Sequence, residues 1–190
     1  MKQYKETFIN LFHGTTVDAA EEIVRTQHFI PSNGNNWCGD GVYFYDNKSK
    51  AWWAANRKCE EIRMNTGIKK RATYVNADIV DLDRCFILDL RAYNDLRDFV
   101  NKTEAKLKEQ GFGIVDDIDD EEKLIILRSI LISYYAQEYK KKLVIGNFQQ
   151  RTQPKVADLF PKADGLRLVI GVETIYCVKD ASIISNIRGV

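Results

Sequence analysis

Hydrophobic and polar positions follow two different periods along this chain, and the period changes from segment to segment. Runs typical of strands cover residues 8–12, the segment around Tyr43, and residues 74–79, 85–90, 144–148, 166–170, 173–178 and 183–187. Helical spacing covers residues 17–24, the segment that follows Asn47, and residues 95–110 and 124–139. Residues 149–161 are predicted to form a loop with a short helical turn at 156–160. Strands thus gather at the two ends of the chain with helices inserted between them, which predicts one α+β domain over residues 1–190.

Two local signals mark where the first helices begin and which way they face. Thr16 or Asp18 can cap the helix at 17–24, because a hydroxyl or carboxylate can accept a hydrogen bond from a free N–H of the first turn. In the second helix, four apolar residues fall on one predicted face: Trp52, Ala55, Cys59 and Ile62.

Composition excludes several classes of protein without identifying one. The chain has 190 residues, 45% of them hydrophobic, and a formal net charge of +1, so nothing global favours binding to nucleic acid or to a membrane. No apolar run approaches the about eighteen residues of a membrane span, and the polar start of the chain lacks a secretion signal. We therefore expect a cytoplasmic protein that acts in the cell that makes it. Four cysteines without Cys-x-x-Cys spacing and two histidines predict no metal site.

Candidate chemistry is concentrated in two glycine-containing segments near the N-terminus. Leu11-Phe12-His13-Gly14-Thr15-Thr16 places an imidazole, a backbone without a Cβ and a hydroxyl at the end of an apolar strand. A ligand can approach the main chain closely at such a glycine. Gly39-Asp40-Gly41-Val42-Tyr43-Phe44 presents a tyrosine from a short strand, and its ring could serve as a stacking surface.

These two segments resemble the donor site of ADP-ribosyltransferases of the poly(ADP-ribose) polymerase type. The resemblance requires a glutamate on a late strand, and Glu173 in Glu173-Thr174-Ile175-Tyr176 fits it. It implies a split, mixed β core with NAD+ in the cleft and a catalytic triad of His13, Tyr43 and Glu173. In that family the histidine bonds the adenosine ribose, the following glycine binds the carboxamide, the tyrosine stacks on nicotinamide and the glutamate bonds the ribose hydroxyl.

The resemblance continues into the helix after Tyr43 and then departs from the family pattern. Ser49 and Lys50 match the family's Ser-Lys-Ser, whereas Ala51 stands where the second serine would hold the carboxamide. The second stacking tyrosine aligns with Ala54, and Trp52 or Trp53 could replace it. The resemblance therefore assigns NAD+ contacts to His13, Gly14, Thr15, Tyr43, Ser49, Lys50 and Trp52.

The resemblance predicts mono-ADP-ribosylation of a macromolecule by an intracellular toxin or phage-defence effector, which could have an antitoxin partner. Gly171 excludes the Glu-x-Glu and Gln-x-Glu patterns of arginine- and asparagine-modifying relatives. Basic runs at 69–71 and 140–142, the second beside tyrosines, lead us to favour RNA or DNA slightly over protein as acceptor. The default interpretation of such runs is a solvated surface. Three alternatives remain: transfer to protein, NAD+ glycohydrolysis, and an inactive module that senses NAD+ or ADP-ribose.

Overall fold

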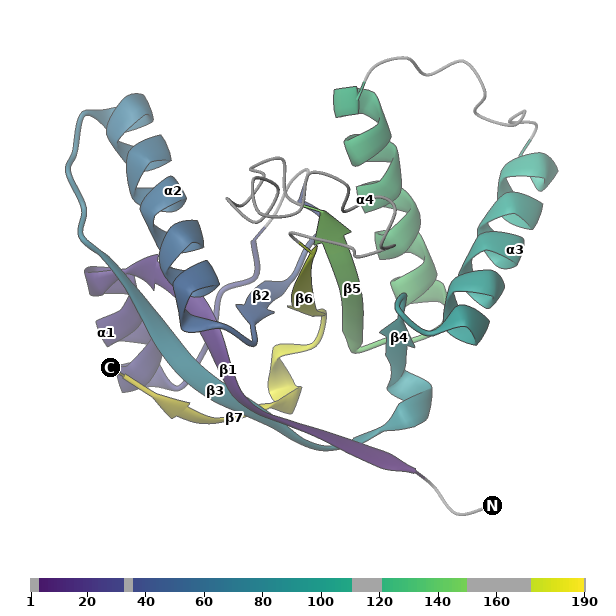
Figure 1. Ribbon diagram of the computed structural model, residues 1–190, viewed down its shortest axis with the longest axis horizontal. Coiled ribbons are helices and arrows are strands. Elements are labelled where there is room, and N and C mark those ends of the chain that lie inside the picture. The colour runs from purple at the N-terminus through teal and green to yellow at the C-terminus, as the bar shows by residue number, and fades with distance from the viewer. Residues whose placement is uncertain (1–3, 33–35, 111–120, 150–171, 190) are drawn as a thin grey trace, which may run out of the picture.

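The computed structural model describes residues 4–32, 36–110, 121–149 and 172–189. Within them the protein is α+β, with a seven-stranded mixed sheet and four α-helices (Figure 1). The strands are β1 (Lys5–Thr16), β2 (Val42–Tyr45), β3 (Ala72–Asp83), β4 (Ile87–Asp89), β5 (Leu143–Gln149), β6 (Val172–Val178) and β7 (Ile184–Arg188). The helices are α1 (Val17–Thr26), α2 (Lys48–Thr66), α3 (Tyr93–Glu109) and α4 (Glu121–Glu138), with short 3-10 turns η1 (Arg84–Phe86) and η3 (Ala181–Ile183).

Most predicted elements are confirmed, and the differences are local. The apolar run at 85–90 was predicted to be one strand but divides into η1 and the three-residue β4. On α2, the buried residues are Ala51 and Ala55, whereas Trp52 is 48% exposed, so the predicted face was wrong for Trp52. The strand predicted at 166–170 and the helical turn predicted at 156–160 lie outside the described residues.

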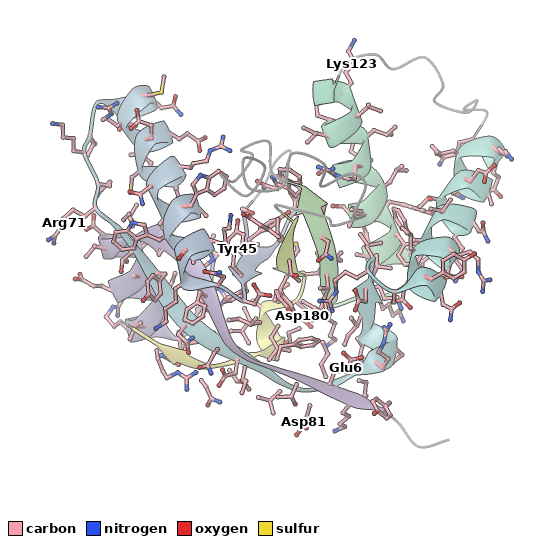
Figure 2. All side chains as sticks on the ribbon, in the orientation of Figure 1. Glu6, Tyr45, Arg71, Asp81, Lys123 and Asp180 are labelled. Carbon is pink, nitrogen blue, oxygen red and sulfur yellow. The ribbon has the colours of Figure 1, made fainter. Side chains whose placement is uncertain are left out.

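The sheet is divided between two neighbouring strands, β1 and β2. Its strand order is β4-β5-β6-β2-β1-β3-β7, and β4 and β5 form the one parallel pair among the described strands. β1 pairs with β3 from Lys5 to Thr16, but it meets β2 at a single registered pair, Phe12 with Tyr45. The β1-β3-β7 half and the β2-β6-β5-β4 half therefore separate on either side of this point (Figure 1). Tyr45 lies in the middle of the molecule, where the halves meet (Figure 2).

Helices cover both faces of the divided sheet. α1 packs Ala20 and Ile23 on one face, in a cluster with Phe44 and Val75. On the opposite face, α2 and α4 contribute the buried residues Ala51, Ile132, Tyr135 and Ala136, which pack with Phe12, Tyr45, Val144, Ile175 and Cys177. Because residues alternate between faces along a strand, Tyr43 and Glu173 lie on this second face, with Tyr45 and Ile175.

Side-chain caps fix the helix starts that position the candidate site. Thr16 Oγ1 accepts a hydrogen bond of 3.4 Å from Ala19 N, so the helix begins directly after the His-Gly-Thr-Thr strand end. Asn47 Oδ1 accepts a hydrogen bond of 2.8 Å from Ser49 N, and α2 begins after a connection of two residues, Asp46 and Asn47. The short β2–α2 connection therefore holds the first turn of α2 beside the division in the sheet.

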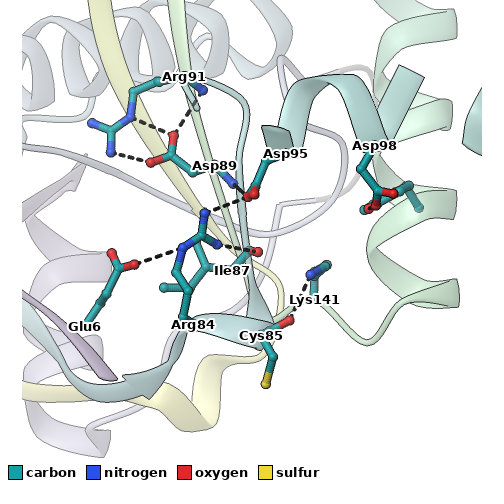
Figure 3. A network of polar contacts seen from close by, with 10 residues as sticks. Glu6, Arg84, Cys85, Ile87, Asp89, Arg91, Asp95, Asp98 and Lys141 are labelled. Atoms are coloured by element: carbon teal, nitrogen blue, oxygen red, sulfur yellow. Dashed lines mark hydrogen bonds and ion pairs between the residues drawn. The ribbon is translucent and has the colours of Figure 1, made fainter. Parts of the chain in front are cut away.

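Arg84 anchors the far end of the molecule. Its guanidinium pairs with Glu6 of β1 at 3.0 Å and Asp95 of α3 at 2.9 Å, and it donates to the Ile87 carbonyl at 3.2 Å (Figure 3). Asp95 also accepts a hydrogen bond of 2.8 Å from Asp89 N. Arg84 therefore ties β1 to β4, a strand of the other half of the sheet, and to the helix α3.

Gly14 allows β1 to lie directly against the backbone of α2. A Cβ at this position would be 1.9 Å from the Ala51 carbonyl oxygen and 2.9 Å from Ala55 N. Both neighbours are backbone atoms of a helix, so a side-chain movement cannot relieve the overlap. The glycine that the sequence assigns to ligand approach is thus also required by helix packing.

We predict that Gly14→Ala lowers the free energy of unfolding by about 1–3 kcal/mol, as overpacking does elsewhere. Gly189→Ala is the matched control, because a Cβ there meets only Val24 Cγ2, at 3.4 Å. Urea unfolding followed by circular dichroism measures both. Equal stability of the two variants would contradict the close approach of β1 to α2.

Candidate active site

The predicted site residues come from three segments that meet at the division in the sheet. Gly14, Tyr43 and Glu173 lie on the α2 face, whereas His13 contacts Phe29 and Phe44 of the cluster on the α1 face. His13, Gly14 and Thr15 lie near the end of β1, and Tyr43 lies on β2. Ser49, Lys50 and Trp52 belong to α2, which follows β2, and Glu173 is the second residue of β6. The first turn of α2 joins them, because its Ala51 carbonyl faces Gly14 and its Lys50 reaches Glu173.

His13 spans the division between the sheet halves. Its Nδ1 lies 2.9 Å from the carbonyl oxygen of Tyr43. A carbonyl can only accept, so Nδ1 carries the proton and Nε2 presents a lone pair. Burial lowers the pKa of His13 to about 4, although the Tyr43 carbonyl opposes this shift, and the imidazole contacts the rings of Phe29 and Phe44. At neutral pH His13 is therefore an uncharged imidazole that can accept a hydrogen bond from a ligand hydroxyl.

The ring of Tyr43 is held in place through its hydroxyl. That hydroxyl donates to the Gly39 carbonyl and accepts a hydrogen bond of 3.0 Å from Cys38 N. Burial raises the pKa of Tyr43 well above its usual value, so the hydroxyl stays neutral. The phenol is thus tied to the loop that precedes its own strand, and its orientation does not depend on a ligand.

Glu173 is a buried carboxylate, 8% exposed, and it forms an ion pair with Lys50 of α2. The Lys50 side chain is 33% exposed, so the pair opens toward solvent on the lysine side. The cross-strand neighbour of Glu173 on β5 is Phe148, which is also buried. Glu173 therefore presents a fixed negative charge at the edge of an apolar surface.

Register sets the separation between Tyr43 and Glu173. Tyr43 pairs with Cys177 and Tyr45 with Ile175, so Glu173 lies four residues further along β6 than the partner of Tyr43. At about 3.3 Å per residue this corresponds to about 13 Å along the strand. The two side chains thus mark the ends of an elongated surface rather than a single point of contact.

The remaining residues assigned to NAD+ differ in their access to solvent. Thr15 is 1% exposed, so its hydroxyl reaches a ligand only if β1 or the residues packed against Thr15 move. Ser49 is exposed at the start of α2. Gly14 is partly buried against Ala51, which itself has no exposed surface.

The two tryptophans of α2 have different neighbours. Trp52 meets the edge of Tyr74 on β3, with ring centroids 6.4 Å apart, and Lys48 on the same helical face lies 5.6 Å over Phe12. Trp53 lies three residues after Lys50, hence on the helical face that reaches Glu173, and Arg57 stacks over it at 5.2 Å. Both tryptophans are exposed, at 48% and 44%, so each remains a candidate for the second aromatic surface.

One group near Glu173 was not predicted from the sequence. Arg128 of α4 lies 5.1 Å over the ring of Phe148 and 5.0 Å over that of Trp37, and the two rings are 4.9 Å apart. Arg128 falls in a segment with no recognisable motif, and Trp37 precedes the glycine-tyrosine motif by two residues. Only their contacts in the fold reveal the cluster.

In the part of the chain that the structure describes, no group of three His, Cys, Asp or Glu side chains could hold a metal ion. Across the same residues, every helix is too short or too polar to cross a membrane.

Comparison with known proteins gives one weak relative. An uncharacterized protein of Methanocaldococcus jannaschii is 28% identical over 104 residues, which is 52% of this chain and 48% of the archaeal protein. The match thus spans about half the length of that relative. No known family matches the chain, and no solved structure matches it.

We predict that protonation of His13 makes the fold less stable in mild acid. The unfolded histidine titrates near its ordinary pKa of about 6.5, whereas the folded one titrates at about 4. Between these values the unfolded chain binds more protons, so stability falls as pH decreases from about 6.5 to 4, by up to about 3 kcal/mol. His13→Asn keeps a donor near the Nδ1 position without titrating, and should show a flatter profile in urea unfolding at each pH. An unchanged slope would mean that His13 is not buried as described.

A second prediction concerns the ion pair. Lys50→Met leaves the buried Glu173 without its cation and should destabilise the fold by about 1–3 kcal/mol, less than a fully buried pair because Lys50 is partly solvated. Lys50→Met combined with Glu173→Met should recover most of that loss, since it removes the isolated charge. Additive losses in the double variant, measured by urea unfolding, would contradict the pairing.

Proposed function

We propose that this protein is an NAD+-dependent ADP-ribosyltransferase that uses Glu173 as its catalytic carboxylate. The observation that carries the proposal is the buried Lys50–Glu173 ion pair at the end of the apolar surface that also holds Tyr43. A charge held in such a place costs desolvation energy, and an apolar pair of similar size would often serve stability as well. Charged groups kept at such a cost are frequent in active sites.

The chemistry needs a fixed negative charge beside a sugar. Cleavage of the nicotinamide–ribose bond passes through an oxocarbenium-like transition state, in which positive charge develops on the ribose. The Glu173 carboxylate would accept a hydrogen bond from a hydroxyl of that ribose and stabilise the developing charge. Lys50 would pair with the carboxylate and hold it in position. Because Glu173 is already desolvated, its interaction with the transition state is stronger than it would be in water.

The other predicted residues would bind and orient NAD+. The free Nε2 lone pair of His13 suits a ribose hydroxyl, which is the role that the resemblance implies for this histidine. The ring of Tyr43, fixed through its hydroxyl, would provide a stacking surface for nicotinamide. The division between β1 and β2 supports the proposal too, since it agrees with the split, mixed core expected of the family.

A sensor function is the second candidate, and one observation favours it. Ala51 replaces a carboxamide-binding serine and is fully buried, and Gly14 beside it packs against the helix. Such a site would hold the amide through backbone groups of Gly14 with fewer side-chain contacts. A module that binds NAD+ or ADP-ribose without turnover would tolerate this loss better than a transferase. The proposed setting, a cytoplasmic toxin or defence effector with an antitoxin, rests on the family resemblance alone.

Radiolabelled NAD+ tests the proposal directly, with RNA, DNA and protein from a cell lysate offered as separate acceptors. We predict that wild type labels one of these fractions and that Glu173→Gln lowers the rate about 100-fold or more, because it removes the charge while keeping the shape. Glu60→Gln is the matched control. Glu60 is an exposed glutamate on α2 that forms an ion pair with the exposed Arg63 of the same helix, and its loss should leave the rate unchanged.

Calorimetry separates the proposed enzyme from the alternatives. Glu173→Gln should keep NAD+ affinity within a few fold, because the carboxylate is expected to act mainly in the transition state. Binding of NAD+ without labelling of any acceptor, and without release of nicotinamide, would establish the sensor instead. Release of nicotinamide with no labelled acceptor would identify a glycohydrolase.

A further inference from the structure

Helix α4 packs along residues Trp37–Asp40. This line of contact connects a basic cavity with the Arg128 cluster, and the proposed reaction uses neither of them. Gly39 packs against α4 so closely that a Cβ would lie 1.9 Å from Ser133 Oγ and 2.8 Å from the Ser129 carbonyl. Arg128 Nε also donates to the Trp37 carbonyl at 3.2 Å. This contact line, here called the α4 seam, follows the loop that holds the hydroxyl of Tyr43.

One end of the α4 seam is a basic cavity of about 470 Å³. Its charged lining consists of Lys140, Lys141, Lys142 and Lys179 together with Asp40 and Asp180, an excess of two positive charges. The cavity lies where α4 turns into β5, beside the turn after β6 that carries Asp180 (Figure 2).

Two of these ammonium groups are positioned by uncharged partners. Lys141 Nζ donates to the Cys85 carbonyl at 2.8 Å (Figure 3), and Lys179 Nζ donates to the carbonyls of Cys38 and Asp40, each at 2.6 Å. Carbonyl oxygens orient a lysine without cancelling its charge. Lys142 by contrast pairs with Asp180 at 2.9 Å. The cavity therefore keeps fixed positive charge available for an anion.

The other end of the α4 seam is the cluster of Arg128, Trp37 and Phe148. Trp37 is 37% exposed, and Phe148 is the cross-strand neighbour of Glu173. From Arg128 to Lys140 the chain advances twelve residues, almost all of them in α4, which at 1.5 Å per residue is about 18 Å. A ligand that lies along the seam would thus reach from the basic cavity to the neighbourhood of the catalytic carboxylate.

We propose that the α4 seam binds single-stranded nucleic acid, with backbone phosphates in the basic cavity and a base on Trp37, and so delivers the acceptor to Glu173. This inference rests on the proposed transferase function and names its acceptor class. Lysines are common phosphate ligands, and exposed aromatic rings beside basic groups suit unpaired bases. An acidic peptide would use the lysines but would gain little from the ring of Trp37.

Binding of a fluorescent twelve-nucleotide single-stranded RNA to the Glu173→Gln protein, without NAD+, tests the proposal independently of catalysis. Lys140→Asn with Lys141→Gln removes two cavity charges that no carboxylate pairs with among the contacts described above, and asparagine suits position 140 because its φ is 51°. The matched control is Lys69→Asn with Arg71→Gln, the other basic run, which lies at the outer edge of the molecule near α2 (Figure 2).

We expect the cavity double variant to bind RNA about tenfold more weakly, and its slope of log affinity against log salt to be shallower by about 1.4, the value for two phosphate contacts. Trp37→Leu should weaken binding about fivefold or more through lost stacking. The control should bind like the parent. Equal loss in the control and the cavity variant, or competition by polyglutamate as strong as by unlabelled RNA, would overturn the proposal.

The outcomes also separate this proposal from the proposed function. Seam-dependent RNA binding in a protein that transfers no label would retain the binding site and overturn the transferase. Transfer of ADP-ribose to protein, with RNA binding unaffected by the cavity variant, would retain the transferase and overturn the nucleic-acid seam.

Discussion

The hydrogen bond between His13 Nδ1 and the Tyr43 carbonyl is the interaction on which the arrangement of this site depends. β1 and β2 meet at one registered pair and then diverge, so the backbone groups beyond that pair lose their ladder partners. The His13 imidazole supplies a donor for one of them at 2.9 Å. The same bond fixes the tautomer and leaves Nε2 as the acceptor that the proposed reaction needs. Nδ1 of His13 thus holds the two strands together, and Nε2 of the same ring is the proposed acceptor for a ligand hydroxyl.

Helix α2 connects the strand that carries His13 to Glu173. The absence of a Cβ at Gly14 lets α2 approach β1 closely, and the same turn places Lys50 against the buried carboxylate. A larger residue at position 14 would displace the helix and the ammonium group together. This explains why a glycine beside the histidine and a lysine 36 positions later act as one unit, although only the resemblance, and no local rule, connects them in the sequence.

The sequence was sufficient to predict the elements that depend on interactions between residues close together in the chain. Periodicity predicted the helices, and Thr16 was correctly a candidate cap because its hydroxyl can reach a first-turn N–H. The division of the sheet came only with the family resemblance, since it depends on pairing between strands distant in the chain. Neither the sequence nor the fold decides between Trp52 and Trp53 as an aromatic surface, because helical spacing alone does not say which residue faces a ligand and both side chains are exposed. Arg128 and Trp37 could not be predicted, because 91 residues separate them and neither belongs to a motif.

The central claim is that the divided sheet, with His13 on one side and Glu173 on the other, forms a binding site for NAD+. A crystal structure with an NAD+ analogue whose nicotinamide ribose is carbocyclic tests it most directly, because the analogue cannot be cleaved. The account predicts a hydroxyl of that sugar within hydrogen-bond distance of the Glu173 carboxylate, nicotinamide against Gly14 and Tyr43, and the other ribose on His13 Nε2. An analogue bound away from these residues, or no binding at millimolar concentration, would contradict it.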